Sequence, residues 1–169
     1  MGKAQFIENH QLVAGIIPVD LATAANNGDW VSLKLYGHVT CVLYTAAGTA
    51  GDDPIFKMQQ ATAVAGTSAK DLLFDTIYTK AVVGTAQTSI GQFTKVTQAA
   101  ATSYTDATHA EIQKIYVVEF DAEDLDTENG FDCIQMSVAD VGAGGAQIGC
   151  GFYILSDPRY TPPPSAIVD

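Results

Sequence analysis

Residues 26–48 read NNGDWVSLKLYGHVTCVLYTAAG, a strand-like run between two glycine-containing turns. A period of two places a mostly apolar set on one face: Val31, Leu33, Leu35, Val39, Cys41 and Leu43. It places a mostly polar set on the other face: Ser32, Lys34, Tyr36, His38, Thr40 and Tyr44. Gly37 interrupts the run, which indicates a bulge, a bend or two strands that meet at a corner. The stretch therefore predicts strand structure with one buried and one solvated face.

Similar short runs recur along the chain, separated by turns rich in Gly, Pro, Asn and Asp. The further runs are residues 13–19, 55–62, 71–80, 112–121, 131–138 and 147–155. Because amphipathic helices are lacking, seven to nine such strands predict an all-β, single-domain antiparallel β-sandwich that is jelly-roll-like. Its predicted core contains Trp30, Leu33, Leu35, Val39, Val118, Phe120, Ile134, Phe152 and Ile154.

Local signals place several of these elements. Pro18 makes residues 13–19 an edge strand, since proline cannot donate to a sheet on both sides. Residues 112–121 are apolar on both faces, which predicts a central strand. In residues 55–62 we expect Phe56 and Met58 to be buried.

The domain limits follow from composition. Residues 13–156 form the predicted sandwich, and residues 1–12 precede it as an N-terminal arm. Residues 157–169 hold four of the six prolines and predict an extended Pro-rich tail outside the core.

Composition restricts the partners. The 8 Lys and Arg against 19 Asp and Glu give a net charge of −11, which opposes binding to nucleic acid. No apolar run approaches the roughly 20 residues of a membrane helix, and the start of the chain lacks a long apolar signal core, so we expect a soluble protein that does not bind membranes. Only 16% of residues are charged, less than is usual for a free monomer, which favours a surface that meets other subunits.

Candidate sites were weighed against simpler interpretations. Three separated cysteines predict three buried thiols rather than a disulfide or a metal site. The acidic segment 121–132 does not fit an EF-hand calcium loop, since Asn129 stands where glycine belongs. It predicts a solvated helical turn that Asp121 caps, with Leu125 inward and Gly130 at its end, and a weak cation site is the alternative. The glycine-rich residues 141–146 lack a phosphate-binding ending and predict a hairpin loop.

No combination of residues predicts chemistry. His10, His38 and His109 lie in unrelated contexts, and the chain has no Gly-x-Ser-x-Gly nucleophile turn. We therefore expect no catalytic, cofactor-binding or metal-binding residues, and hence no enzyme. A small β-fold enzyme or ligand-binding module is the remote alternative.

Several segments together resemble a family. These are residues 23–34, 46–54, 60–66, 119–121, 129–133 and 157–160, and the likeness covers nearly the whole chain. They resemble small structural proteins encoded in tailed-bacteriophage and prophage virion modules. Within that group, the size, β character and low charge are most similar to a capsid decoration, or cement, protein, with a tail-tube subunit or another virion component as the alternative.

The resemblance implies a location and partners. We expect a protein made in the bacterial host cytoplasm that binds the exterior of the capsid, contacts the phage major capsid protein, and forms a homo-oligomer, with a trimer favoured over a dimer. The candidate interface lies in the arm and the tail: Phe6, Ile7, Leu12, Ile16, Tyr160, Pro162, Pro163 and Pro164.

Overall fold

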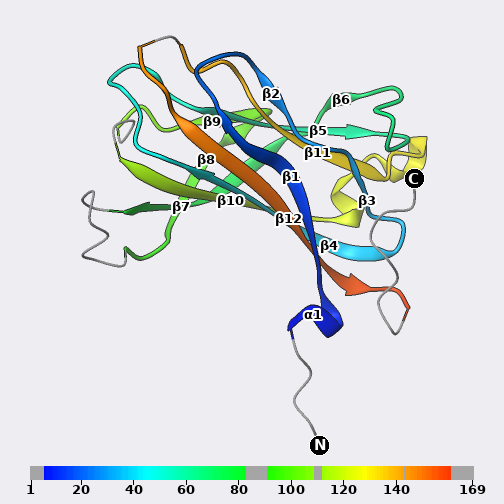
Figure 1. The fold of residues 1–169 in the computed structure, drawn as a ribbon. Coiled ribbons are helices and arrows are strands. Elements are labelled where there is room, and N and C mark those ends of the chain that lie inside the picture. The colour runs from blue at the N-terminus through cyan, green and yellow to red at the C-terminus, as the bar shows by residue number, and fades with distance from the viewer. Residues whose placement is uncertain (1–5, 83–90, 109–111, 143, 161–169) are drawn as a thin grey trace, which may run out of the picture.

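The computed structural model describes residues 6–82, 91–108, 112–142 and 144–160, and these form an all-β sandwich (Figure 1). The predicted fold class is confirmed, because two antiparallel sheets pack face to face. The helical elements are short: α1 (Phe6–Asn9), η1 (Ala122–Asp124) and η2 (Thr127–Asn129).

Sheet A has six strands in the order β1-β12-β4-β10-β7-β8. Their bounds are β1 (Gln11–Asp20), β12 (Ile148–Pro158), β4 (Tyr36–Thr45), β10 (Gln113–Asp121), β7 (Phe74–Val82) and β8 (Thr94–Ala101). The first described strand therefore pairs with the last one. The predicted edge position of the Pro18 strand and the predicted central position of β10 are both confirmed.

Sheet B lies above sheet A in the view of Figure 1 and follows the order β2-β11-β5-β6, with β3 also paired to β11 and β9 also paired to β5. Its strands are β2 (Asn26–Asn27), β11 (Cys133–Val138), β5 (Ile55–Ala61), β6 (Lys70–Asp71), β3 (Val31–Ser32) and β9 (Ser103–Thr105). Phe56 and Met58 of β5 are fully buried, as predicted.

The stretch that decides the fold turns a corner between the two sheets. β2 and β3 belong to sheet B and β4 belongs to sheet A, and the Tyr36 N–H donates to the Leu33 carbonyl oxygen across the intervening turn at 3.2 Å. The turn lies just before Gly37 and interrupts the alternation of buried and exposed side chains. Tyr36 is consequently buried, although the alternation predicted that it faces solvent, whereas Leu35 is only half-buried.

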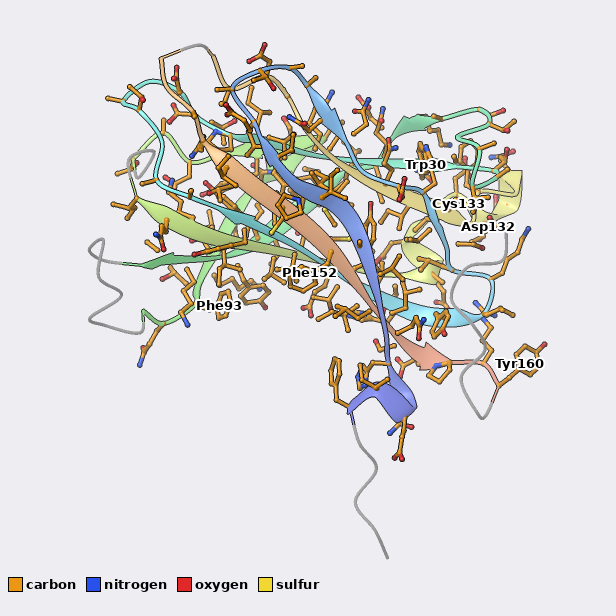
Figure 2. The ribbon with its side chains drawn as sticks, viewed as in Figure 1. Trp30, Phe93, Asp132, Cys133, Phe152 and Tyr160 are labelled. Atoms are coloured by element: carbon orange, nitrogen blue, oxygen red, sulfur yellow. The ribbon has the colours of Figure 1, made fainter. Side chains whose placement is uncertain are left out.

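Five of the predicted core residues are buried, namely Leu33, Val39, Val118, Phe120 and Ile134. Trp30 and Leu35 are half-buried, so their placement in or near the core holds only in part. Trp30 lies on the sheet B side (Figure 2) and packs so closely on Gly66 that a Cβ there would come within 2.8 Å of the indole nitrogen.

The predicted inward positions of Phe152 and Ile154 are wrong. In β12 the buried residues are Tyr153 and Leu155, and the alternate residues are half-buried on the opposite face. The inward row of β12 also contains Gly149 and Gly151, whose missing side chains leave room for Leu21 and Met136. Because two of the inward positions of β12 are glycines, the outward face carries more large apolar side chains than the inward face. The count of apolar side chains therefore predicted the wrong face as buried.

Tyr153 joins the two sheets by hydrogen bonds. Its hydroxyl, on β12 of sheet A, accepts from the Met136 N–H of β11 at 2.8 Å and donates to the Asp29 carbonyl oxygen at 2.9 Å. Gly15 and Gly28 pack against the same side chain, and a Cβ at Gly15 would come within 2.8 Å of the Tyr153 ring. Burial raises the pKa of Tyr153 well above its ordinary value, so the phenol stays protonated.

Two predicted loops have different outcomes. The predicted capped turn is confirmed in part: the segment forms two 3-10 turns, η1 after Asp121 and η2 before Gly130, which lies in the left-handed region at φ 79°, and Leu125 is buried as predicted. The Asp121 side chain makes no capping hydrogen bond, and the Asp124 carboxylate instead accepts from the Asp121 N–H. The hairpin prediction for residues 141–146 is wrong, because the strands on either side, β11 and β12, belong to different sheets. The loop crosses between them and is held by Asp52, whose carboxylate accepts from the Gly144 N–H at 2.8 Å.

The three cysteines are free thiols, with Cys41 and Cys133 buried and Cys150 half-buried. The prediction of buried thiols is therefore confirmed for two of the three. Burial raises the pKa of the Cys133 thiol to about 12 and also raises that of Cys41.

The raised thiol pKa values predict alkaline destabilisation. Above about pH 8.5 the unfolded chain loses thiol protons that the folded chain keeps, so the free energy of unfolding falls as pH rises toward 12. Each buried thiol contributes a slope of up to about 1.4 kcal/mol per pH unit. Urea unfolding at pH 8, 9 and 10 measures this slope. Cys133→Ser is expected to reduce the slope, and an unchanged slope in that variant would contradict the assignment.

Candidate assembly surface

The predicted interface residues lie in three environments. Phe6, Ile7 and Leu12 are 52%, 62% and 53% exposed at the N-terminal end, and Tyr160 is 65% exposed after β12. Ile16 is 4% exposed and belongs to the core, so its predicted role as a contact residue is wrong. Its neighbour Gly15 lies at a register shift in β1 that turns Ile16 inward. Pro162, Pro163 and Pro164 lie outside the described residues.

The N-terminal segment is ordered locally in the structure. Phe6 stacks on His10 with ring centroids 4.2 Å apart, and the His10 N–H donates to the Phe6 carbonyl oxygen at 3.0 Å. The helix α1 also contacts β12, the strand that leads to Tyr160. The exposed apolar groups of the predicted arm therefore lie on a short helix and at the start of β1.

The side of sheet A that points away from sheet B, which we call the outer face, is largely apolar. Cross-strand partners share a face, so the register defines its rows. Four rows run across β12, β4, β10 and β7, in that order of strands. The first row is Cys150, Tyr44, Ile115 and Lys80, and the second, central row is Phe152, Val42, Val117 and Tyr78. The third row is Ile154, Thr40 and Glu119, and the fourth is Ser156, His38 and Asp121. Figure 2 shows Phe152 and Phe93 on this side of the sheet, away from β5 and β11. The first two rows hold six apolar or aromatic side chains and one cation.

A hollow of about 240 Å³ opens on the outer face between Tyr78, Phe93, Val117 and Glu119. Phe93 is 51% exposed there, and the Lys80 ammonium lies 5.5 Å from the centre of its ring. An exposed aromatic ring beside half-buried apolar residues is typical of a surface that another molecule covers.

The other end of the outer face is polar. His38 Nδ1 lies 2.8 Å from the Asp121 carboxylate, and its Nε2 lies 3.8 Å from that of Glu119. Thr40 Oγ1 is 3.4 Å from His38 Nε2 and donates to Glu119 at 3.3 Å. These two rows together resemble a hydroxyl-imidazole-carboxylate arrangement, but the Thr40 hydroxyl donates to the Glu119 carboxylate on an open sheet surface. The arrangement acts as a hydrogen-bonded polar border rather than as an activated nucleophile.

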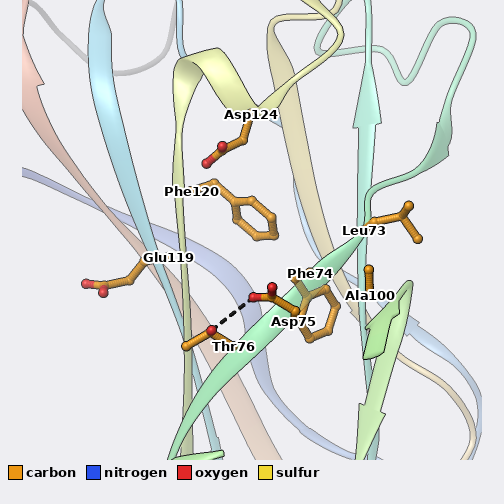
Figure 3. A pocket seen from close by; sticks show the side chains of 8 residues that line it. All are labelled: Leu73, Phe74, Asp75, Thr76, Ala100, Glu119, Phe120 and Asp124. Carbon is orange, nitrogen blue, oxygen red and sulfur yellow. Dashed lines mark hydrogen bonds between the residues drawn. The ribbon is translucent and has the colours of Figure 1, made fainter. Parts of the chain in front are cut away.

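A second hollow, of about 280 Å³, lies where β7 separates from β10 (Figure 3). The ladder between these strands ends at the Val117–Tyr78 pair, and the rings of Phe74 and Phe120 meet edge to face beyond it. The side chains that line this hollow include three carboxylates, those of Asp75, Glu119 and Asp124. Asp75 accepts a hydrogen bond from Thr76, and Asp124 accepts one from the Asp121 N–H.

A third hollow, of about 420 Å³, contains a buried ion pair. Lys114 Nζ lies 3.2 Å from the Asp106 carboxylate and donates to the Asp106 carbonyl oxygen at 3.1 Å, with side chains 2% and 11% exposed. Asp106 follows β9 of sheet B and Lys114 lies in β10 of sheet A, so the pair ties the two sheets together. Sequence reasoning missed this pair, because a lysine in an alternating strand normally predicts a solvated position.

Among the residues that the structure describes, no group of three or more His, Cys, Asp or Glu side chains could hold a metal ion. Within the same residues, no helix has the length and apolar character needed to cross a membrane.

No protein-family model and no curated protein matches this chain.

Proposed function

We propose that this chain is a non-enzymatic virion structural protein that binds the exterior of a phage capsid and stabilises the shell as a decoration protein. The observation that carries the proposal is the pair of exposed apolar side chains on α1, Phe6 and Ile7, next to the strand that leads to Tyr160. The all-β sandwich is compatible with it, because double-sheet β domains recur in viral capsids. Fold alone does not define function, so the argument depends on the exposed surface.

The proposed partner is the phage major capsid protein. Full burial of such an apolar side chain is worth about 1.5–3 kcal/mol, and the side chains of the N-terminal segment are 52–62% exposed, so a partner that covers one gains roughly half of that. Weak contacts of this size become strong attachment when a homo-oligomer binds several sites at once, which raises the affinity by a factor on the order of 10² to 10⁴. Such attachment needs no chemistry from the protein.

Capsids of the cognate phage that lack this protein provide the test. Adding the purified chain is expected to produce saturable binding and to raise the temperature at which the capsids break open. The double variant Phe6→Ser/Ile7→Ser is expected to bind at least about tenfold more weakly, because it loses two apolar contacts. Leu73→Ser is the matched control, since Leu73 is 59% exposed but lies just before β7, which β4 and β10 separate from β12 in sheet A.

The outcomes separate the alternatives. If the purified chain stacks into tubes and ignores capsids, it is a tail-tube subunit. Wild-type protein that neither binds capsids nor forms tubes would contradict a virion role of either kind. Equal binding by the double variant and Leu73→Ser would remove α1 from the interface but leave the capsid role in place.

A further inference from the structure

The outer face of sheet A is large enough to be an interface by itself. Six strands spaced about 4.8 Å apart span about 29 Å, and nine residues at about 3.3 Å each span about 30 Å, which gives an area on the order of 800 Å². A standard protein interface buries about 800 Å² on each partner. The central row of Phe152, Val42 and Val117 carries no charge.

The charges on this face lie at opposite ends of the strands. Lys80 pairs with Ile115 in the first row, and Glu119 and Asp121 occupy the last two rows. Four residues along β10 separate the Lys80 row from the Glu119 row, a distance of about 13 Å. The row of Phe152, Val42 and Val117 lies between them and is uncharged as far as Tyr78, and it ends at Lys95 on the edge strand β8. The face thus has an apolar centre, with the lysines toward one end and the β8 edge and the carboxylates at the other end.

We propose that the outer face of sheet A is a two-fold interface between two copies of this chain. A two-fold axis that lies in the interface and crosses the strands turns one face over onto the other. It sets the apolar centres against each other and brings Lys80 of each copy toward Glu119 and Asp121 of its partner. Two twisted sheets that meet in this way pack at about −30°, as the layers of a β-sandwich do.

The charge pattern selects a second copy over an unrelated partner. Two chains of net charge −11 repel each other, so self-association needs a contact region without net negative charge. The apolar centre provides such a region, and the opposite ends of the face complement each other under the two-fold axis. A face that meets its own copy forms a closed pair, so this geometry favours a dimer over the trimer expected from the sequence.

The interface goes beyond the proposed capsid function and does not depend on it. α1 and Tyr160 lie outside the rows that the two copies share. A dimer would therefore carry two copies of the proposed capsid-binding segment. Self-association and capsid binding are separate measurements, so either can fail alone.

The test is the mass of the purified full chain in solution, measured by light scattering and sedimentation at about 1–100 µM. Wild-type protein is expected to have twice the mass of the chain. Val117→Lys is expected to weaken the dimer at least about tenfold, because it places a charge in the apolar centre. Ile55→Lys is the matched control, since Ile55 is also a half-buried β-branched residue but lies in sheet B, and it is expected to leave the dimer intact.

Charge reversal tests the orientation. Lys80→Glu and Glu119→Lys are each expected to weaken the dimer, because each places like charges opposite one another. The double variant Lys80→Glu/Glu119→Lys is expected to recover most of the loss. Additive losses in the double variant would overturn the two-fold arrangement.

Thiol labelling provides a readout that needs no variant. Cys150 is the half-buried thiol and lies beside Tyr44 in the first row of the outer face, whereas the other two thiols are buried. Its labelling by a maleimide is expected to slow at least about tenfold as the protein concentration rises through the dissociation constant. A monomer at all concentrations, a trimer, or Cys150 labelling that is independent of concentration would overturn the proposal.

Discussion

Replacing Asp106 with alanine is expected to lower the free energy of unfolding by about 3–5 kcal/mol, because it leaves the Lys114 ammonium buried without its carboxylate. Lys114 and Asp106 are only 2% and 11% exposed, so the ammonium stays largely desolvated in the folded variant. Urea unfolding of the variant beside the wild type measures the loss.

Two further variants separate the charge from the packing. The double variant Asp106→Ala/Lys114→Met removes both charges and is expected to recover much of the loss, since an apolar pair often replaces a buried ion pair at little cost. Lys34→Met is the surface control. Its partner is Asp132 at 3.1 Å, but Lys34 is 67% exposed, so the expected loss is below about 1 kcal/mol. Equal losses for Asp106→Ala and Lys34→Met would contradict the buried pair.

Replacing Tyr153 with phenylalanine is expected to cost about 2–3 kcal/mol. The variant keeps the ring but removes the hydroxyl, which leaves the Met136 N–H and the Asp29 carbonyl without their partner. The glycines beside the ring leave little room for a water molecule to replace the hydroxyl. The midpoint of urea unfolding is therefore expected to fall with little change in slope.

Tyr44→Phe is the matched control for Tyr153→Phe. Tyr44 also loses one hydroxyl hydrogen bond, to Gln113 at 3.0 Å, but lies half-buried on the outer face. Water can reach its partner, so the expected loss is below about 0.5 kcal/mol. A loss at Tyr153 no larger than that at Tyr44 would show that the hydroxyl does not join the sheets.

Much of the fold was predictable because alternation is a local property. The strand run through Val39 and the apolar run that became β10 placed a long strand and a central strand correctly, and Pro18 identified the edge. The phase was less predictable. The turn before Tyr36 buries a residue that the alternation assigned to solvent, and the inward glycines of β12 hide which face of that strand is buried. Neither effect can be read locally, because the glycines leave room for the side chains of Leu21 and Met136 from distant parts of the chain.

The surface was predictable only in part. Exposed apolar residues near the start of the chain could be read from their polar neighbours, as Phe6 and Ile7 show. Ile16 has a similar local context, but a register shift turned it into the core. The outer face could not be found from the sequence, because it consists of residues from strands that are distant in the chain, such as Val42, Val117 and Phe152. A signal was nevertheless present, since the β10 run was apolar on both sides.

The position of β12 determines when the molecule can become complete during translation. In sheet A this strand lies between β1 and β4, so β1 reaches the rest of its sheet only through residues 148–158. Until the ribosome has released those residues, β1 has no neighbour and β4 has one open edge. Such non-local pairing is slow and leaves apolar strands exposed meanwhile. Assembly of the nascent chain must therefore wait for its last described strand, and chaperones have time to bind before the sandwich closes.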